Sequence, residues 1–296
     1  MSAALNWDED GKAWPNREAS RFVEAGGLRW HVQVMGAGPT ALLLHGTGAA
    51  SHSFADLAPF LSRRFTVVVP DLPGHGFTET PAYERLSLPA MAEGLGDLMT
   101  VLGLSGPDSG PILAAGHSAG AAILARMCLD QLIRPRLLVS LNGAILPLHG
   151  TQGKLFAPLA KAFVSSGFMP TLFAWRARKT NFVAQLMRST GSTIDEDKFA
   201  HYATLAGNAN HVEAAIGMMA NWDLKALEPD LSRLEPKLLL ITGANDRMIP
   251  PSHSLRLRRI LPEPRLEILP DLGHLAHEEN PDEIGALILD AFDSIG

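Results

Sequence analysis

The sequence PILAAGHSAGAAILARMCL, residues 111–129, decides the fold. A short run of small and apolar residues leads into GHSAG at 116–120, and an almost wholly apolar run fills 121–129. This order predicts a strand, a tight turn and a buried helix, which is the context in which a G-x-S-x-G pentapeptide forms a nucleophile elbow. Gly116 and Gly120 fit this prediction, because the strand and the helix pass too close there for a Cβ. The plainer interpretation is a glycine-rich turn before a core helix.

The composition allows one large domain with a sizeable core. The chain has 296 residues, of which 46% are hydrophobic and 19% are charged, and its net charge of −6 argues against general nucleic-acid binding. The single cysteine, Cys128, cannot form a disulfide within the chain and is expected to be a buried, inert thiol. The N-terminus lacks the apolar core of a secretory signal, and no uncharged apolar run reaches about 18 residues. We therefore expect a cytoplasmic protein, with peripheral contact to the inner membrane as one option.

Short apolar segments alternate with helical segments over most of the chain, which predicts a parallel sheet covered on both faces. An alternation of apolar and polar residues around Gly26-Gly27 predicts an antiparallel hairpin. Beyond the segment 111–129, we expect strands at 21–25, 28–34, 41–44, 65–69, 137–141, 237–242 and 265–269, and helices at 54–61, 88–102, 252–260 and 281–292.

The alternation stops between about 144 and 232. This segment is helical in composition, and it is broken at Pro170 and at Gly191-Ser192. We predict that 1–143 and 233–296 form the core, and that 144–232 is a helical cap, or lid, over the carboxyl edge of the sheet, where ligands bind in α/β folds.

Candidate catalytic residues follow three of the predicted strands. A serine hydroxyl needs a base, typically a histidine that is held by a carboxylate. Past the last two strands stand Asp246 and then His274, so Ser118, Asp246 and His274 follow the chain order of an α/β-hydrolase triad. Asp271 is the rival acid, but it lies only three residues before the histidine. Some hydrolases carry the acid after the sixth strand, where this chain has Asn142.

Two backbone N–H groups aimed at one point form an oxyanion hole. We predict that Ala119, directly after the serine, supplies one and that Thr47 supplies the other. Thr47 lies in the loop after the strand at 41–44, together with His45, Gly46 and Gly48. His45 is expected to be structural beneath this oxyanion loop.

The site residues also have plainer interpretations. Asp246 could be a solvated loop acid and His274 a capping residue, but both fall at the right strand ends in the right order. The elbow motif leaves the position of His117 free. His274 and His277 could be metal ligands, but no cysteine or acidic cluster completes such a site. We predict no metal and no cofactor.

Five motifs together resemble those of the α/β-hydrolase superfamily: HGTG at 45–48, DLPGHG at 71–76, GHSAG at 116–120, GANDRMIP at 243–250 and GHLAHEENP at 273–281. The resemblance covers nearly the whole chain. It implies a mostly parallel eight-stranded sheet flanked by helices, with the helical lid inserted between strands 6 and 7. It also carries Ser118, Asp246 and His274 over as the triad. Dehalogenases and epoxide hydrolases of this fold use an aspartate nucleophile, so the serine excludes their chemistry.

A narrower resemblance is to the BchO family, hydrolases described as magnesium chelatase accessory proteins of bacteriochlorophyll synthesis. It rests on WPNREASRFVEAGGLRWHVQVMG at 14–36, HGTGAASHSF at 45–54, DLPGHGFT at 71–78 and the lid. It implies an apolar tetrapyrrole or a related ester as ligand, and association with magnesium chelatase, but no particular reaction.

Three hypotheses follow: an esterase-like serine hydrolase that forms an acyl-enzyme, a porphyrin-binding accessory protein with an idle triad, and a carbon–carbon bond hydrolase. The intact triad favours the first over the second and does not separate the first from the third.

The predicted lid is locally basic in an acidic chain. The span 151–190 has no Asp or Glu and six basic residues, Lys154, Lys161, Arg176, Arg178, Lys179 and Arg188, interleaved with apolar and aromatic residues. We predict that Arg176, Arg178 and Lys179 form a basic face at the substrate entry, which could grip the carboxylates of a porphyrin or lie on an anionic bilayer. The plainer interpretation is an ordinary lid, whose apolar residues pack on the sheet while its basic residues sit in water.

Overall fold

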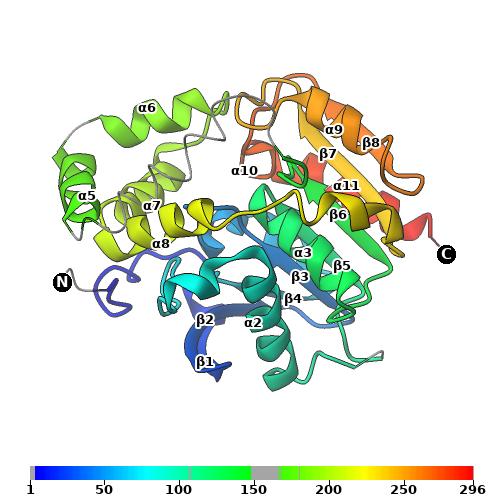
Figure 1. Cartoon of the computed structure of the whole chain (residues 1–296), viewed down its shortest axis with the longest axis horizontal. Coiled ribbons are helices and arrows are strands. Elements are labelled where there is room, and N and C mark those ends of the chain that lie inside the picture. The colour runs from blue at the N-terminus through cyan, green and yellow to red at the C-terminus, as the bar shows by residue number, and fades with distance from the viewer. Residues whose placement is uncertain (1–3, 107, 148–165, 167, 180, 296) are drawn as a thin grey trace.

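A computed structural model describes residues 4–106, 108–147, 166, 168–179 and 181–295, and its centre is an eight-stranded sheet (Figure 1). The strand order is β1-β2-β4-β3-β5-β6-β7-β8. The strands are β1 Ser20–Ala25, β2 Leu28–Met35, β3 Thr40–Leu44, β4 Thr66–Pro70, β5 Leu113–His117, β6 Leu137–Leu141, β7 Lys237–Gly243 and β8 Arg265–Leu269. β2 runs antiparallel to β1 and β4, and every other neighbouring pair is parallel. The predicted eight-stranded, mostly parallel sheet is confirmed, as is the hairpin.

Helices cover both faces of this sheet (Figure 1). The helices α2 (Leu88–Val101) and α3 (Ala119–Leu129) pack on one face, and α1 (Leu57–Ser62) and α11 (Pro281–Asp293) pack on the other. Successive residues of β3 alternate between the two cores. Because both faces are covered, the central strands are apolar throughout instead of alternating with polar residues.

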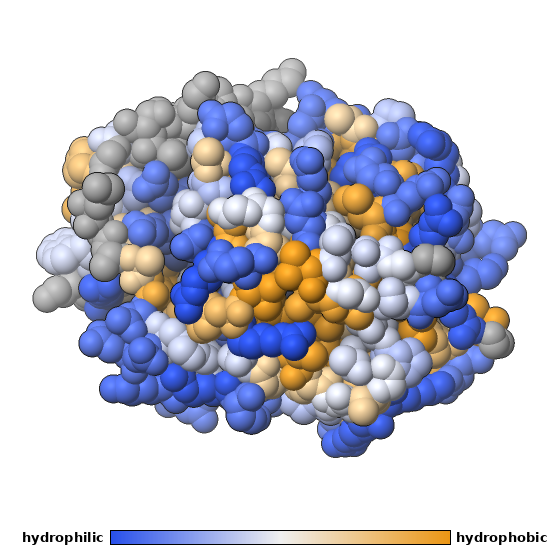
Figure 2. All heavy atoms as spheres, turned by 90° about the horizontal axis from the view of Figure 1, so that it is seen from below, coloured by the Kyte–Doolittle hydropathy of each residue, from blue (hydrophilic) through white to orange (hydrophobic). Residues whose placement is uncertain are grey.

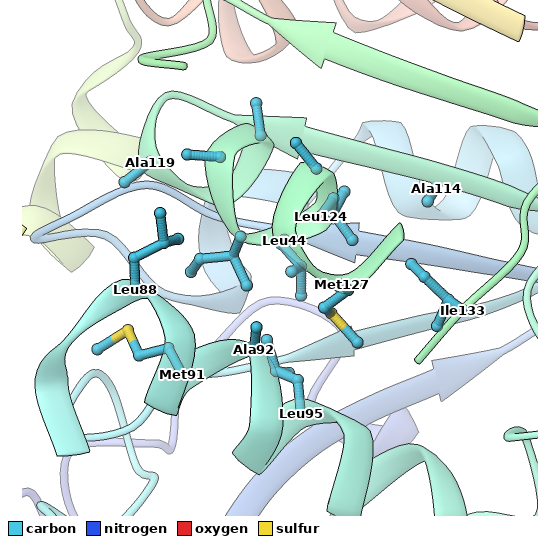
Figure 3. Close-up of a cluster of buried hydrophobic side chains, with 14 of the residues drawn as sticks. Leu44, Leu88, Met91, Ala92, Leu95, Ala114, Ala119, Leu124, Met127 and Ile133 are labelled. Carbon is cyan, nitrogen blue, oxygen red and sulfur yellow. The ribbon is translucent and has the colours of Figure 1, made fainter. Parts of the chain in front are cut away.

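The core around α2 and α3 holds the elbow helix in place. Figure 3 shows Leu88, Met91 and Leu95 of α2 facing Leu124 and Met127 of α3 over the sheet, and all five side chains are buried. Substantial free energy depends on this contact, since burial of each such side chain contributes about 1.5–3 kcal/mol. The position of Ser118 is therefore set by a rigid part of the molecule.

Among the described residues between β6 and β7, the α-helices are α5 Met169–Lys179, α6 Phe182–Ser189, α7 Glu196–Ala206 and α8 Ala209–Ala220. They gather at one end of the molecule (Figure 1). The predicted breaks agree with their bounds, because Pro170 is at the start of α5 and Gly191 follows the end of α6. Lys154 and Lys161 lie outside the described residues, as does the side chain of Lys179.

Two predicted helices differ from the structure in detail. The helix expected at 54–61 is a 3-10 helix at Ser51–Phe54 followed by α1, and the helix expected at 252–260 is α9 at Pro251–Leu257. The short helix α10 (Ala276–Glu279) was not expected. Three more 3-10 turns lie at Arg17–Ala19, Tyr83–Leu86 and Glu228–Arg233.

The surface is mostly polar on the face that Figure 2 shows, around a central apolar patch. In the described part of the chain, none of the helices has the length and the apolar character that a membrane span requires.

Candidate active site

Ser118 stands between the end of β5 and the start of α3, with backbone angles φ 50° and ψ −116°. Residues with a side chain rarely adopt a positive φ, so this turn stores strain. The two glycines of the turn are required because neither position has room for a Cβ. A Cβ at Gly116 would meet the backbone of Ala121, and a Cβ at Gly120 would collide with the carbonyl oxygen of Leu44. The sequence therefore folds here into the sharp turn that an exposed nucleophile needs.

Asp246 is buried, and its carboxylate accepts four hydrogen bonds. Oδ2 accepts from Nδ1 of His274 at 2.8 Å and from Nδ2 of Asn142 at 2.7 Å. Oδ1 accepts from the backbone N–H groups of Met248 and Ile249, each at 2.8 Å. Because an ionised carboxylate can only accept, Nδ1 of His274 carries the proton and Nε2 is left as the acceptor. His274 thus has the tautomer that a general base needs.

The structure places Asp246 beside His274, whereas the side chain of the rival Asp271 is exposed. Asn142 does more than occupy the place of an alternative acid. It has a positive φ of 47°, and its side-chain amide bridges Asp246 to the carbonyl oxygen of Gly273, the latter at 3.2 Å. Sequence reasoning missed this positioning role.

Two contacts bring neighbouring loops to the elbow. His117 donates from Nε2 to the carbonyl oxygen of His274 at 2.9 Å, and the centroids of the two rings are 4.7 Å apart. Burial, with added repulsion from His277 and His274, holds the pKa of His117 well below its usual value, so this histidine is a neutral donor. On the other side, a Cβ at Gly46 would lie 2.9 Å from the Cβ of Ser118. The oxyanion loop and the histidine loop therefore both reach the elbow.

The predicted oxyanion donors flank Ser118. Ala119 begins α3, so its N–H is among the first four of the helix and has no partner within it. Thr47 is next to Gly46, and its hydroxyl donates to Sδ of Met218 on α8 at 3.4 Å. The roles of Thr47 and Ala119 as donors stay predictions.

His45 is buried beneath the oxyanion loop, as expected. Its Nδ1 donates to the carbonyl oxygen of Gly46 at 2.8 Å, and its Nε2 accepts from the N–H of Leu72 at 2.9 Å. Burial lowers the pKa of His45, which keeps the ring neutral and both bonds intact. The ring therefore ties the loops after β3 and β4 together.

A histidine of α8 holds the far end of the same loop. His211 is buried, with Nε2 3.2 Å from the carbonyl oxygen of Gly48 and Nδ1 accepting from the N–H of Gly76 at 3.2 Å. Burial lowers the pKa of His211 to about 4, so the neutral ring donates from Nε2 near pH 7. Nothing in the sequence around His211 marks this contact.

A buried carboxyl group lies four residues beyond His274. Oε1 of Glu278 accepts from the hydroxyls of Ser53 at 2.5 Å and Tyr202 at 2.6 Å, and Tyr202 belongs to α7. Lys198 of α7 donates to the carbonyl oxygen of Glu278 at 2.6 Å. Burial raises the pKa of the Glu278 carboxyl to about 7. These bonds join α7 to α10, which begins two residues after His274.

A cleft of about 960 Å³ lies between N-terminal residues and α5, α6 and α7. Arg178 lines it together with Glu9 and Asp10, while Ser118 and the oxyanion loop are not among its lining residues. Arg176 and Arg178 of the predicted basic face are exposed. Among the described residues, no three His, Cys, Asp or Glu side chains are arranged to hold a metal ion.

Comparison with known proteins identifies the fold. The model of the alpha/beta hydrolase family matches residues 41–287. The chain belongs to the α/β-hydrolase family. This α/β-hydrolase is 37% identical to the magnesium-chelatase 30 kDa subunit of Rhodobacter capsulatus, over 94% of its own length and 95% of that protein. It belongs to that narrower family too, which confirms the resemblance to BchO proteins.

More distant relatives of the α/β-hydrolase carry hydrolase names. It is 24% identical to the 2-hydroxy-6-oxo-6-phenylhexa-2,4-dienoate hydrolase of Burkholderia cepacia, over 89% of its own length and 91% of that protein. A crystal structure of an alpha/beta hydrolase fold protein from Burkholderia ambifaria superposes with a TM-score of 0.77 at 22% identity, covering 98% of this chain and all of that one. That likeness shows the fold alone.

Proposed function

We propose that this α/β-hydrolase is a serine hydrolase that cleaves an ester-like bond of an apolar substrate. The observation that carries the proposal is the buried carboxylate of Asp246, which holds Nδ1 of His274. The strained Ser118 follows His117, which donates to the carbonyl oxygen of His274. This is the arrangement in which a histidine becomes a general base for a serine.

The residues suit acyl-enzyme chemistry in two steps. Oγ of Ser118 attacks the substrate carbonyl carbon while Nε2 of His274 takes the hydroxyl proton, and the N–H groups of Thr47 and Ala119 stabilise the oxyanion. The intermediate collapses as His274 returns the proton to the leaving alcohol. A water molecule then attacks the acyl-enzyme with His274 again as the base, which releases the acid and restores the serine. Asp246 keeps His274 in one tautomer throughout.

The substrate proposal rests on the family and on the helices between β6 and β7. We assign 144–232 as the cap over the core formed by 1–143 and 233–296, with Arg176, Arg178 and Lys179 near the entrance. A relative named as a magnesium-chelatase subunit supports a tetrapyrrole ester as the ligand, and association with the chelatase. Peripheral carboxylates of a tetrapyrrole would suit arginine and lysine side chains.

The names of relatives favour one alternative reaction. A dienoate hydrolase is among the proteins that match most of the chain, so cleavage of a carbon–carbon bond by the same three residues is the second candidate. A third is an accessory role in which the pocket holds a porphyrin and the triad is idle. The three candidates differ in whether Ser118 is reactive and in which bond breaks.

Labelling with a fluorophosphonate tests the serine directly. The parent protein should label stoichiometrically at Ser118, and Ser118→Ala should not label. A panel of aryl and alkyl esters, with a dienoate ketone alongside, then separates the two hydrolases. A parent that neither labels nor cleaves any member of the panel would leave the idle-triad hypothesis and refute the proposed hydrolase.

A further inference from the structure

One face of α5 exposes large apolar side chains to solvent. Phe168, directly before the helix, is 61% exposed, and Leu172 and Trp175 within it are 45% and 57% exposed. Spacings of four and three residues place them on one side of the helix, at about 100° of rotation per residue. We call these three residues the α5 stripe. Water-facing helices normally carry polar residues at such positions, so the stripe needs an explanation.

The opposite side of α5 is already buried. Pro170, Ala174 and Ala177 are buried against the molecule, where α5 packs on α7 and α8. Phe173 adds a half-buried aromatic ring to the packed part of the helix, where it meets Phe182 edge to face. A helix that only covers a core would carry polar residues on its other side, and α5 carries the stripe there. The exposed side chains therefore do not belong to the packing of α5 on its neighbours.

Basic residues flank the α5 stripe. By helical rotation, Arg176 lies about 80° to one side of its centre and Arg178 about as far to the other. Both are exposed, and the side chain of Arg178 also packs against Gly207. The span 151–194 contains no Asp or Glu although the chain has a net charge of −6, so a negative surface would attract this end of the molecule and repel the rest. The acids near Arg178 are Glu9 and Asp10, which share its cleft.

We propose that the α5 stripe docks on an anionic lipid surface. Phe168, Leu172 and Trp175 would enter the boundary between headgroups and acyl chains, where aromatic side chains are favoured. Arg176 would extend its charged end to the lipid phosphates, as long basic side chains do at interfaces. The helix lies in the plane of the membrane surface. The proposal is independent of the hydrolase chemistry.

Co-sedimentation of the full chain with vesicles tests the proposal. Vesicles of equal phosphatidylglycerol and phosphatidylcholine should bind the parent at low salt, pure phosphatidylcholine vesicles should bind it far less, and high salt should release it. Leu172→Gln/Trp175→Gln should lower the affinity about tenfold or more. Leu255→Gln is the matched control, because Leu255 of α9 is 43% exposed and α9 lies at the other end of the molecule (Figure 1).

A second pair of variants tests the contribution of positive charge. Arg176→Gln/Arg178→Gln should lower the affinity for anionic vesicles about tenfold, whereas Arg258→Gln/Arg259→Gln, which also removes two exposed charges, after α9, should change it less than twofold. Brominated lipids should quench tryptophan fluorescence of the parent more than that of Trp175→Phe, because the other four tryptophans are buried or half-buried. Thermal unfolding of all variants, followed by circular dichroism, keeps a loss of folding distinct from a loss of docking.

Three results would overturn the proposal. One is that the parent protein does not bind anionic vesicles at low salt. Another is equal loss of binding in the α5 and α9 variants, which would mean diffuse charge attraction. The third is a dimer in light scattering that Leu172→Gln/Trp175→Gln dissociates without changing vesicle binding, which would make a second copy of the chain the occupant of the stripe.

Discussion

Replacement of Asp246 by asparagine is the sharpest test of the proposed site, because the side chain keeps its shape and loses its charge. The carboxylate accepts two hydrogen bonds on each oxygen, from His274 and Asn142 on Oδ2 and from two backbone N–H groups on Oδ1. An asparagine has one acceptor oxygen and one NH₂ group. In Asp246→Asn, the amide NH₂ group must therefore face one of the two pairs of hydrogen-bond donors, which it cannot accept from.

The neighbouring groups determine which of the two donor pairs rearranges. The backbone N–H groups of Met248 and Ile249 cannot change, so the amide oxygen should stay with them. The NH₂ group then faces His274, which accepts at Nδ1 only if its proton moves to Nε2. Asn142 can turn its own amide to match, since its Oδ1 otherwise has no hydrogen-bond partner in the described part of the chain. The relaxed variant thus keeps the hydrogen bonds at position 246, loses the one from Asn142 to the carbonyl oxygen of Gly273, and carries the wrong histidine tautomer.

The expected loss is large in rate and small in stability. A histidine with its proton on Nε2 cannot take one from Ser118, and this defect costs about 10⁴ in turnover in a well-studied Ser-His-Asp enzyme. At 1.36 kcal/mol for each tenfold change, that is about 5.4 kcal/mol of transition-state stabilisation. The free energy of unfolding should fall by only about 1–2 kcal/mol, because most of the hydrogen bonds re-form and only the bond from Asn142 to Gly273 is lost.

Initial rates on a p-nitrophenyl ester, with fluorophosphonate labelling rates beside them, measure the loss. Asp271→Asn is the matched control, and because Asp271 is exposed its rate should fall less than about threefold. An Asp246→Asn rate within tenfold of the parent rate would refute the tautomer argument, and a larger loss in Asp271→Asn would move the acid to Asp271.

Three other predictions concern the nucleophile, the oxyanion loop and the buried carboxyl. Ser118→Ala should unfold at the temperature of the parent within a few degrees and lose all turnover; retained turnover on an ester that the parent cleaves would exclude Ser118. His211→Leu removes the bond to Gly48 and should lower kcat about tenfold with little change in KM. His211→Gln can still donate a hydrogen bond and should recover part of the loss. Equal rates for both variants and the parent would contradict a positioning role. The pKa of Glu278 is raised to about 7 from 4.5, so the folded state keeps a proton that the unfolded chain releases, and the parent loses stability as pH rises through that window. Glu278→Gln mimics the protonated group and should gain up to about 3 kcal/mol on the parent between pH 4.5 and 7 in urea unfolding, whereas a difference that is constant with pH would argue against it.

The sheet and the elbow could be predicted from the sequence because local signals determine them. Strands buried on both faces are continuous apolar runs, and the hairpin alternates around Gly26-Gly27. The pairing of Asp246 with His274 was predictable for a related reason, since the carboxyl ends of parallel strands meet at one edge of the sheet. Strand order alone therefore brings together residues that are 28 positions apart.

The supporting contacts could not be predicted, because they join segments without any periodic pattern. The bond from Tyr202 to Glu278 spans 76 residues, and the bond from His211 to Gly48 spans 163. The helix expected at 54–61 is present as α1 from Leu57, but the 3-10 turn before it, where the hydroxyl of Ser53 bonds to Glu278, was not predicted. A buried polar network of this kind depends on the finished fold.

The same network limits how a substrate can reach Ser118. Tyr202 and Lys198 tie α7 to Glu278, four residues after His274, and His211 ties α8 to the loop at 45–48. Lifting α7 and α8 together would break these bonds, at a net cost of about 0.5–1.5 kcal/mol each, besides the loss of buried apolar contacts. We therefore expect α7 and α8 to stay in place when a substrate binds.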